Sequence, residues 1–202
     1  MTTTILTTDR LLLRTWQAED LSLMAAINAD PVVMEYFPQI QDMIATEKLL
    51  ARINAQYQQY GYTVYATETL AKHEFIGFVG LFHPSFTIPH FQARSMPIVE
   101  IGWRLSAQHW GKGFATEAAN AVLNYAFTQL QLAEIISFTA AINCRSQRVM
   151  EKIGLQHDPV DDFAHPNLAD DSPLKKHVLY RLHRDDFAKI TTHNTKEDSG
   201  KI

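Results

Sequence analysis

The sequence predicts one domain of mixed α/β class, and three observations lead to this expectation. At 202 residues the chain is long enough to bury a core within one domain, and 46% of it is hydrophobic. Strand-like runs alternate with helical segments along most of its length. Past the middle, a strand, a glycine-rich turn, a helix, a second strand and a second helix follow one another, and such a unit is expected to hold its two strands parallel.

The elements of the first half are expected from β-rich runs and from apolar residues at helical spacing. Pro31 stops the first helix, and Gly61 ends the second. Further prolines and the lack of a clear period predict a loop after the strands. The expected order is a strand over 10–16, a helix over 19–27, a helix from Thr46 to 60, strands over 62–69 and 74–83, and a loop over 84–97.

In the second half, Asn143 is expected to cap a short helix that ends at Gly154. No linker or repeat divides the chain, so residues 1–190 are expected to form the domain and the polar residues 191–202 a disordered tail. The expected order is a strand over 98–105, a helix over 115–130, a strand over 135–141, the short helix, an acidic loop over 158–173 and a last strand over 177–182.

Composition excludes several classes of function. The chain has 18 Lys and Arg against 22 Asp and Glu, which argues against a general nucleic-acid-binding surface. No apolar run is long enough to span a membrane, and the N-terminus lacks the pattern of a signal peptide. The single cysteine, Cys144, excludes an intramolecular disulfide, so a cytoplasmic location is expected. The nine histidines show no ligand spacing, so no metal is expected.

The stretch SAQHWGKGFATEA predicts a phosphate-binding turn before a helix. The Walker pattern fails because Gly113 stands where it requires serine or threonine, and the dinucleotide pattern fails because Thr116 replaces its third glycine. The pattern [RQ]-x-x-G-x-[GA] is met by Gln108, Gly111 and Gly113. Glycines would let a pyrophosphate approach the backbone and the amides at the helix start. The alternative is a turn whose glycines serve only tight packing.

The order of the motifs resembles the GCN5-related N-acetyltransferase (GNAT) superfamily, in particular its RimJ/RimL-like branch. The resemblance covers Thr8 to Phe187 and rests on TDRLLLRTWQAEDL, IGFVGLF, VEIGWRLS running into QHWGKGFATEA, INCRSQRVMEKIGL and HVLYRLHRDDF. It implies the GNAT fold, a mostly antiparallel mixed sheet splayed between two parallel strands and flanked by helices. It also implies direct transfer of an acetyl group from acetyl-CoA to a primary amine, on a protein N-terminus or a small molecule.

The resemblance also implies which residues hold acetyl-CoA. The pantetheine arm would lie along the end of the strand over 98–105, the pyrophosphate on the glycine turn, and Asn143 and Ser146 beside the arm and its thioester sulfur. Asn143 is also a good helix cap without any cofactor. The expected cofactor-binding residues are Trp103, Arg104, Leu105, Gln108, His109, Trp110, Gly111, Lys112, Gly113, Phe114, Ala115, Thr116, Asn143 and Ser146.

The chemistry requires a base, because an amine attacks a thioester only when it is unprotonated. Glu100, which interrupts an apolar run in VEIGW, is the first candidate, since a buried charge needs a partner or a purpose. The alternative is a solvated residue at a sheet edge. Ser146 is the candidate acid for the leaving thiolate, and the superfamily resemblance makes Tyr180 its rival. Cys144 lacks an evident base partner and is expected to be structural.

The candidates for the acceptor site lie in two loops and the last strand. Phe86 and Phe91 lie in the proline-containing loop and are expected to contact the substrate. The other candidates lie in the acidic loop and the last strand, where the resemblance places the acceptor site. They would bind a cationic amine. The alternative is that the loop is only an acidic surface. These candidates are Asp161, Asp162, Phe163, His165 and His177. A monomer or homodimer is expected. A non-catalytic acyl-CoA-binding module of the same fold is the competing class, disfavoured because Glu100, Ser146 and the turn are all present.

Overall fold

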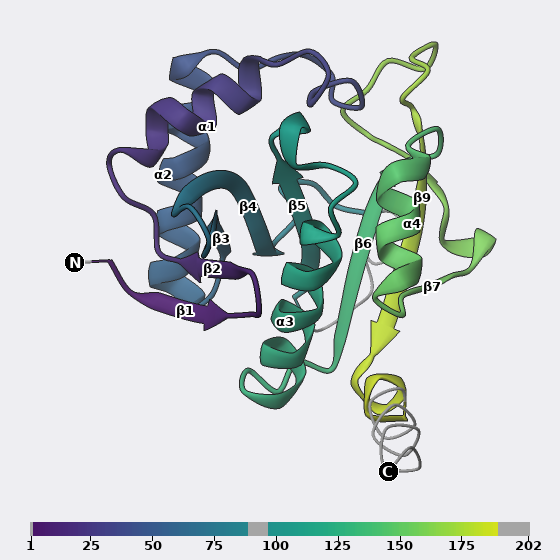
Figure 1. Cartoon of the computed structure of the whole chain (residues 1–202). Helices are drawn as coiled ribbons and strands as arrows, with labels where there is room; N and C mark the ends of the chain where they lie inside the picture. The colour runs from purple at the N-terminus through teal and green to yellow at the C-terminus, as the bar shows by residue number, and fades with distance from the viewer. Residues whose placement is uncertain (1, 89–96, 190–202) are drawn as a thin grey trace.

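The protein, a computed structural model that describes residues 2–88 and 97–189, is built on a nine-stranded sheet flanked by helices (Figure 1). The strand order is β1-β2-β3-β4-β5-β6-β9-β7, and β8 pairs with β9. The strands are β1 (Thr4–Thr7), β2 (Leu11–Arg14), β3 (Val64–Thr69), β4 (Glu74–Phe82), β5 (Glu100–Leu105), β6 (Glu134–Ala140), β7 (Gln156–His157), β8 (Phe163–Ala164) and β9 (Lys176–His183). The labelled helices are α1 (Asp20–Ala29), α2 (Met43–Tyr60), α3 (Phe114–Thr128) and α4 (Cys144–Lys152), with the short 3₁₀ helices η2 (Ala107–His109) and η3 (Pro159–Asp161). Residues 184–189, after β9, are also helical.

The strands β5 and β6 form the parallel pair of the sheet, and the other described pairings are antiparallel. Their contact is short: Glu100 lies opposite Ile136, whose N–H donates to the carbonyl of Val99 at 3.0 Å. Just beyond, the Ser137 hydroxyl donates to the carbonyl of Ile101 at 2.8 Å. From there the two strands separate toward the top of the view (Figure 1). The predicted fold class and the predicted parallel pair are both confirmed.

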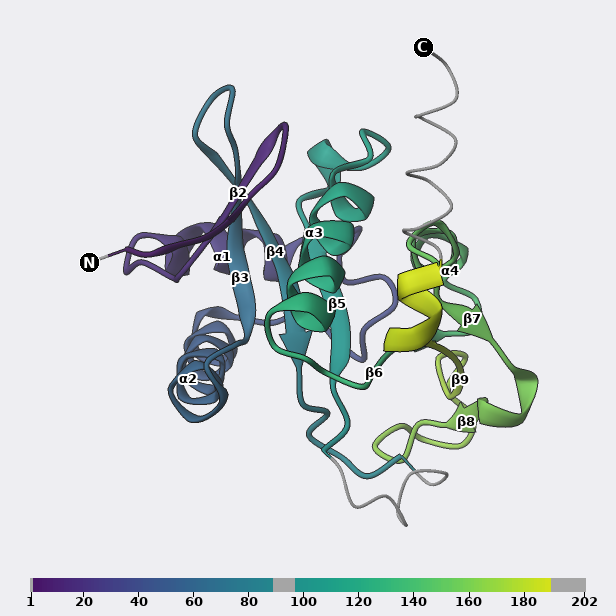
Figure 2. The same ribbon diagram turned by 90° about the horizontal axis from the view of Figure 1, so that it is seen from below.

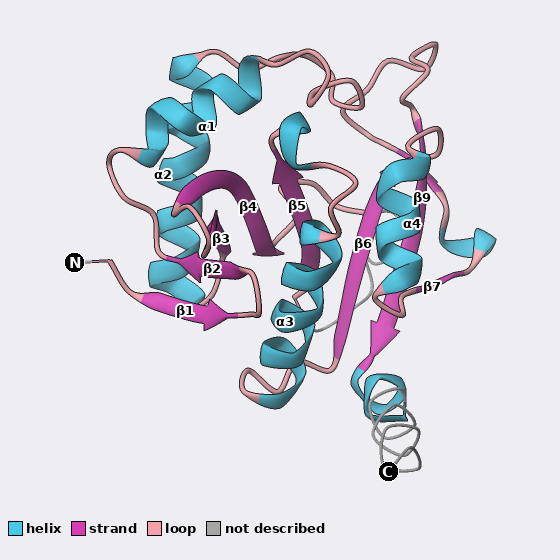
Figure 3. Cartoon of the chain, in the orientation of Figure 1, coloured by secondary structure: helices cyan, strands magenta, loops and turns pink. Residues whose placement is uncertain are grey.

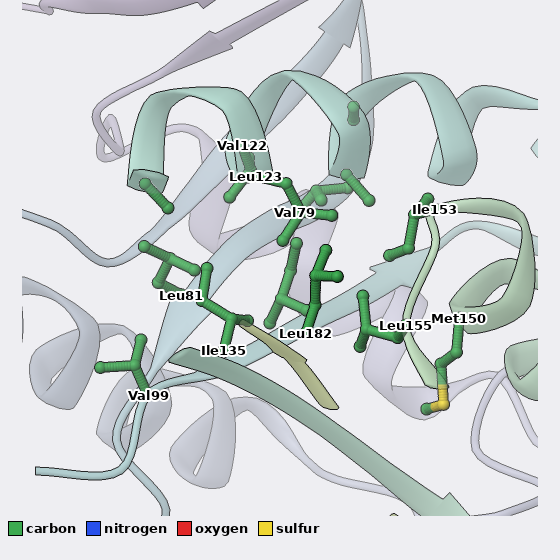
Figure 4. Close-up of a cluster of buried hydrophobic side chains, with 14 of the residues drawn as sticks. Val79, Leu81, Val99, Val122, Leu123, Ile135, Met150, Ile153, Leu155 and Leu182 are labelled. Atoms are coloured by element: carbon green, nitrogen blue, oxygen red, sulfur yellow. The ribbon is translucent and has the colours of Figure 1, made fainter. Parts of the chain in front are cut away.

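Helices cover both faces of the sheet (Figures 2 and 3). On one face α3 and α4 pack against the central strands and form the larger core, which includes Val79, Val122, Leu123, Ile135 and Met150 (Figure 4). On the other face α1 and α2 pack over β3 and β4 through a second cluster, to which Met24, Leu50, Ile53, Val64 and Phe78 belong. The larger core therefore supports the splayed pair from the face covered by α3 and α4, and the second cluster packs against the neighbouring strands β3 and β4.

Two sequence predictions about the elements were wrong, and two short strands were not predicted. The helix α2 begins at Met43, because Asp42 caps it by accepting a hydrogen bond from the N–H of Ala45 at 2.8 Å. Thr46, the predicted start, is buried within the helix and accepts a hydrogen bond from Asn28 at 2.9 Å. The segment 158–173 contains η3 and β8 rather than a loop alone. The edge strand β1 and the two-residue strand β7 were not predicted.

Gly77 is required where β4 passes β5. Its φ is +128°, and a Cβ there would lie 2.1 Å from the carbonyl oxygen of Arg104 and 2.9 Å from the Cα of Leu105. Because both atoms belong to the backbone, the clash cannot be relieved by a rotamer change. We expect Gly77→Ala to lower the free energy of unfolding by about 2–3 kcal/mol. Urea unfolding followed by circular dichroism measures this, and an unchanged midpoint would contradict it.

Candidate active site

A cleft opens where β5 and β6 separate. Its volume is about 640 Å³, and it is lined by both strands, the turn before α3, the start of α4, the segment between α1 and α2, and residues 82–86. Polar and aromatic side chains from segments far apart in the sequence meet there. Its volume lies within the range of small-molecule and cofactor sites, so the cleft is the candidate functional site.

The end of β5 offers an unpaired backbone edge to this cleft. On one side β4 pairs with β5 as far as Leu105, whereas on the other side no described residue of β6 pairs with β5 beyond Glu100. Trp103, Arg104 and Leu105, the residues expected beside the pantetheine arm, all line the cleft. An extended ligand could therefore bind along this edge as an additional strand.

The glycine turn brings the N-terminus of α3 to the cleft. Gly111 and Gly113 have φ values of +72° and +81°, and Gly113 is the N-cap of the helix. An added Cβ at Gly111 would meet no other atom within 4 Å. The indole N–H of Trp110 donates to the carbonyl of Leu105 at 2.9 Å and ties the turn to β5. Free amides and the positive end of the helix dipole make this an anion-binding geometry.

Most, but not all, of the turn residues predicted to bind the cofactor reach the cleft. Those that line it are His109, Trp110, Gly111, Gly113, Phe114, Ala115 and Thr116, whereas Gln108 and Lys112 do not. His109 is buried and lies 3.5 Å from the carboxylate of Glu74. The carbonyl of Lys112 accepts a hydrogen bond from Arg10 at 2.9 Å.

The turn is anchored from outside the cleft by an ion pair that the sequence analysis did not find. Glu117, in the first turn of α3, accepts hydrogen bonds from the Thr8 hydroxyl at 2.6 Å and from the Arg10 Nε at 2.6 Å. Burial alone would raise the pKa of Glu117, but these bonds outweigh it and lower the pKa. The guanidinium of Arg10 also lies over the Phe114 ring at 4.8 Å. The start of α3 is thereby fixed to the N-terminal hairpin.

At the start of α4, Asn143 caps the helix as predicted. Its Oδ1 accepts from the N–H of Ser146 at 3.2 Å, and its Nδ2 donates to Thr139 Oγ1 at 2.9 Å and to Ser146 Oγ at 3.2 Å. Asn143, Ser146 and Thr139 all line the cleft. The cap role and a ligand-facing role are thus compatible, and the Ser146 hydroxyl keeps its proton free to donate.

Glu100 lies in the cleft at the base of the splay. Burial raises the pKa of its carboxyl to about 8, and the nearby guanidinium of Arg52 offsets part of that rise. Phe82 lies directly opposite Glu100 on β4. A carboxyl group with a pKa near neutrality, held next to a cleft, is suited to accept a proton from a bound ligand.

Tyr180, the rival candidate for the acid, does not line the cleft. Its hydroxyl donates to the Glu151 carboxylate at 3.3 Å, and its ring stacks on His157 with the centroids 4.9 Å apart. The hydroxyl is therefore already engaged on the α4 side of β9. This placement favours Ser146 over Tyr180.

Another part of the cleft has an aromatic wall. Phe86, Phe138, His165 and His177 line it, with ring centroids 4.3 Å apart for Phe86 and His165 and 4.9 Å for the two histidines. Burial, together with the neighbouring imidazole of His165, lowers the pKa of His177 to about 4, and burial also lowers the pKa of His165. Both imidazoles are therefore neutral near pH 7. Phe163 is buried in this aromatic cluster and does not line the cleft.

The acidic residues expected to bind a cationic amine are engaged elsewhere. Asp161 pairs with Arg181, and Asp162 pairs with His157 at 2.7 Å and with Lys176 at 4.0 Å. Neither aspartate lines the cleft. Phe91, another predicted contact, lies outside the described residues.

The cleft also contains basic residues that the sequence analysis did not single out. Arg148 and Lys152 stand one turn apart on α4 and line the cleft, as does Arg52 on α2. The sequence could have indicated that Arg148 and Lys152 lie on one face of the predicted helix, because residues four apart share a helix face. Nothing in the local sequence indicates Arg52, which reaches the cleft only through the packing of α2 on the sheet. Among the described residues no His, Cys, Asp and Glu group could hold a metal, and no helix is long and apolar enough to cross a membrane.

A sheet that splays between two parallel strands, with a glycine turn opening the next helix, defines an acetyltransferase fold. The family description "Acetyltransferase (GNAT) domain" matches residues 10–156, and the chain belongs to that family. The protein YkkB of Bacillus subtilis is 32% identical over 155 residues, which cover 76% of this chain and 86% of that protein. The N-acetyltransferase YoaA of the same organism is 30% identical over 159 residues, covering 77% and 85%.

Solved structures share the fold. The acetyltransferase from Agrobacterium tumefaciens has a TM-score of 0.69 and 27% identity, covering 88% of this chain and 93% of its own. Spermidine N-acetyltransferase from Vibrio cholerae, in complex with CoA and spermine, has a TM-score of 0.68 and 20% identity, covering 90% and 99%. The ribosomal L7/L12 N-acetyltransferase RimL, in complex with CoA, has a TM-score of 0.71 but 13% identity, covering 91% and 99%. The likeness to RimL is one of fold, and it does not single out the RimJ/RimL-like branch.

Proposed function

We propose that the protein is a cytoplasmic enzyme that transfers the acetyl group of acetyl-CoA to a primary amine. The observation that carries this is the cleft, which has an anion-binding helix start at one end and Glu100 at the base of the splayed strands. The residues fit acetyl-CoA: the free edge of β5 suits the pantetheine arm, the turn at 111–113 suits the pyrophosphate, and Arg148 and Lys152 suit the remaining negative charge. CoA-bound relatives of the same fold support this assignment.

In the proposed reaction the amine binds in the cleft in its neutral form. As its nitrogen attacks, the nitrogen loses a proton to the carboxylate of Glu100, directly or through water, and Glu100 later returns this proton to solvent. The amine nitrogen forms a bond to the thioester carbonyl carbon, and the carbon–sulfur bond then breaks. Ser146 donates its hydroxyl proton to the departing thiolate and regains one from solvent. The products are an N-acetylated amine and free CoA. Acceptors of several classes, from spermidine to a ribosomal protein, are named for structures of this fold, so the fold alone does not choose among amines.

The test is to incubate the protein with acetyl-CoA and a panel of primary amines and N-terminal peptides, and to follow the release of free thiol. Turnover of at least one amine supports the proposal. Stabilisation by acetyl-CoA without turnover of any amine would favour the alternative, a non-catalytic acyl-CoA-binding module. Failure to bind acetyl-CoA would overturn both. The expectation of a monomer or homodimer stays a prediction.

A further prediction separates the two candidate acids. We expect Ser146→Ala to lower kcat by about tenfold, because a thiolate leaves readily and acid assistance is helpful but not obligatory. Tyr180→Phe is expected to keep the wild-type kcat, since its hydroxyl is bonded to Glu151 outside the cleft. Steady-state kinetics of both variants measure this. A larger loss in Tyr180→Phe than in Ser146→Ala would reverse the assignment.

A further inference from the structure

The charges that line the cleft are unevenly distributed. Among the described lining residues one carboxylate, that of Glu100, faces five basic side chains: Arg52, Arg104, Arg145, Arg148 and Lys152. Arg145 is ion-paired with Glu35. Arg148 and Lys152 lie on α4 at the proposed cofactor side. The excess of positive charge at the opposite side, on α2 and β5, is not accounted for by acetyl-CoA.

Two guanidinium groups make up this second basic site. Arg104 is 9% exposed, and its hydrogen-bond partners are the amide oxygens of Asn28 at 2.6 Å and Gln41 at 3.4 Å. Its Nε is buried without a partner among the described residues, and its guanidinium lies over the Phe37 ring at 4.1 Å. A buried cation that has only neutral partners is costly unless an anion is supplied.

Arg52 is the second group. It extends from α2, is exposed, and makes no hydrogen bond or ion pair with any part of the chain that the structure describes. It is close enough to act electrostatically on both Glu100 and Arg104. The helix α2 covers the face of the sheet opposite α3 and α4 (Figure 2). Arg52 therefore approaches the cleft from the side away from the phosphate-binding turn.

We propose that Arg52, with Arg104 behind it, binds a carboxylate of the acceptor, so that the acceptor is an α-amino acid with an apolar side chain. This inference rests on the proposed function and specifies its substrate class. The guanidinium fork matches a carboxylate in geometry as well as charge. The amine would then lie near Glu100, and the apolar side chain would contact Phe82, which stands opposite Glu100 on β4. A polycation such as spermidine would meet like charges instead.

The experiment compares each amino acid with its amide, which keeps the side chain and removes the negative charge. Phenylalanine, leucine and methionine are tested beside phenylalaninamide, leucinamide and methioninamide, with spermidine as the polycation. Near neutral pH a larger fraction of the amide than of the amino acid has an unprotonated amine, so a preference for the acid at that pH cannot arise from the ionisation of the amine. We expect kcat/KM to favour the carboxylate of at least one pair by about tenfold or more.

Substitutions on α2 test whether Arg52 causes the preference for the acid over the amide. In Arg52→Gln the ratio of acid to amide is expected to fall close to one, chiefly through a higher KM for the acid, and Arg52→Lys should keep part of it. Lys48→Gln is the matched control, because Lys48 is exposed one turn earlier on α2 and does not line the cleft. Any change in the pKa of Glu100 in Arg52→Gln affects both members of a pair and cancels in the ratio.

Several results would overturn the inference. One is that the wild type acetylates the amides or spermidine as efficiently as the amino acids. A preference for the amides would overturn it as well and would point to peptide N-termini as acceptors. An acid-to-amide ratio of kcat/KM that is unchanged in Arg52→Gln would also overturn the inference. Should no amine be turned over, binding of N-acetylphenylalanine and N-acetylphenylalaninamide in the presence of CoA is measured by calorimetry. Equal affinities would overturn the inference, whereas tighter binding of the acid that Arg52→Gln abolishes would support it while the proposed catalysis fails.

Discussion

Replacing Glu100 by glutamine is expected to lower kcat by about 10²–10⁴-fold, because the amide cannot accept the proton of the attacking amine. The carboxyl has a pKa of about 8 in the free protein, so wild-type kcat/KM should rise with pH through that value as the base ionises. In the variant this ionisation is absent. The ionisation of the free amine should appear in the pH profile of kcat/KM for both proteins. The ionisation that is absent only in the variant is therefore assigned to Glu100.

The control for this prediction is Glu47→Gln, an exposed carboxylate on α2 that does not line the cleft. It should keep both the rate and the pH profile. A Glu100→Gln protein with the wild-type rate and profile would show that Glu100 is not the base, and water or the substrate itself would have to carry the proton.

The raised pKa of Glu100 also makes the stability of the fold depend on pH. Because the pKa of Glu100 in the folded protein, about 8, lies above its ordinary value of 4.5, the protonated carboxyl favours folding below about pH 4.5. That contribution is lost as pH rises through 8. We therefore expect the Tm of Glu100→Gln, relative to wild type, to increase between about pH 5 and pH 8 and then to level off. A carboxyl with a raised pKa that is kept for catalysis at a cost in stability would behave in this way.

The order of elements could be predicted from the sequence because each local signal agreed with the next. The glycine turn, the Asn143 cap and the alternation of strands and helices all have short-range physical causes, and the structure places them as expected. The start of α2 was missed because Asp42, rather than Thr46, supplies the capping oxygen, and both residue types cap helices well.

Partners of charged side chains could not be predicted in the same way. Asp161 and Asp162, expected at the acceptor site, pair with basic residues of β9, and Arg52 enters the cleft from a helix some fifty residues before β5. Such pairings depend on the tertiary arrangement rather than on sequence spacing. Glu100 was found because a single carboxylate in an apolar strand is conspicuous without any knowledge of its partners.

Gly111→Ala is expected to raise the KM and the dissociation constant for acetyl-CoA by about a hundredfold. A methyl group at Gly111 would extend into space that no protein atom occupies within 4 Å, where the pyrophosphate is proposed to lie. Keeping the phosphates at a distance would remove charge-assisted hydrogen bonds from backbone amides, each worth about 1.5–3 kcal/mol. Fluorescence or calorimetric titration with acetyl-CoA measures the loss.

Gly61→Ala provides a control matched in backbone strain. Gly61 has a φ of +77°, close to the +72° of Gly111, and an added Cβ there would also meet nothing within 4 Å. It ends α2 and does not line the cleft. Both variants should therefore lose about 1 kcal/mol of stability from the left-handed backbone, whereas only Gly111→Ala should lose affinity for acetyl-CoA. Equal affinities in the two variants would mean that the glycine turn serves packing and that the phosphates bind elsewhere.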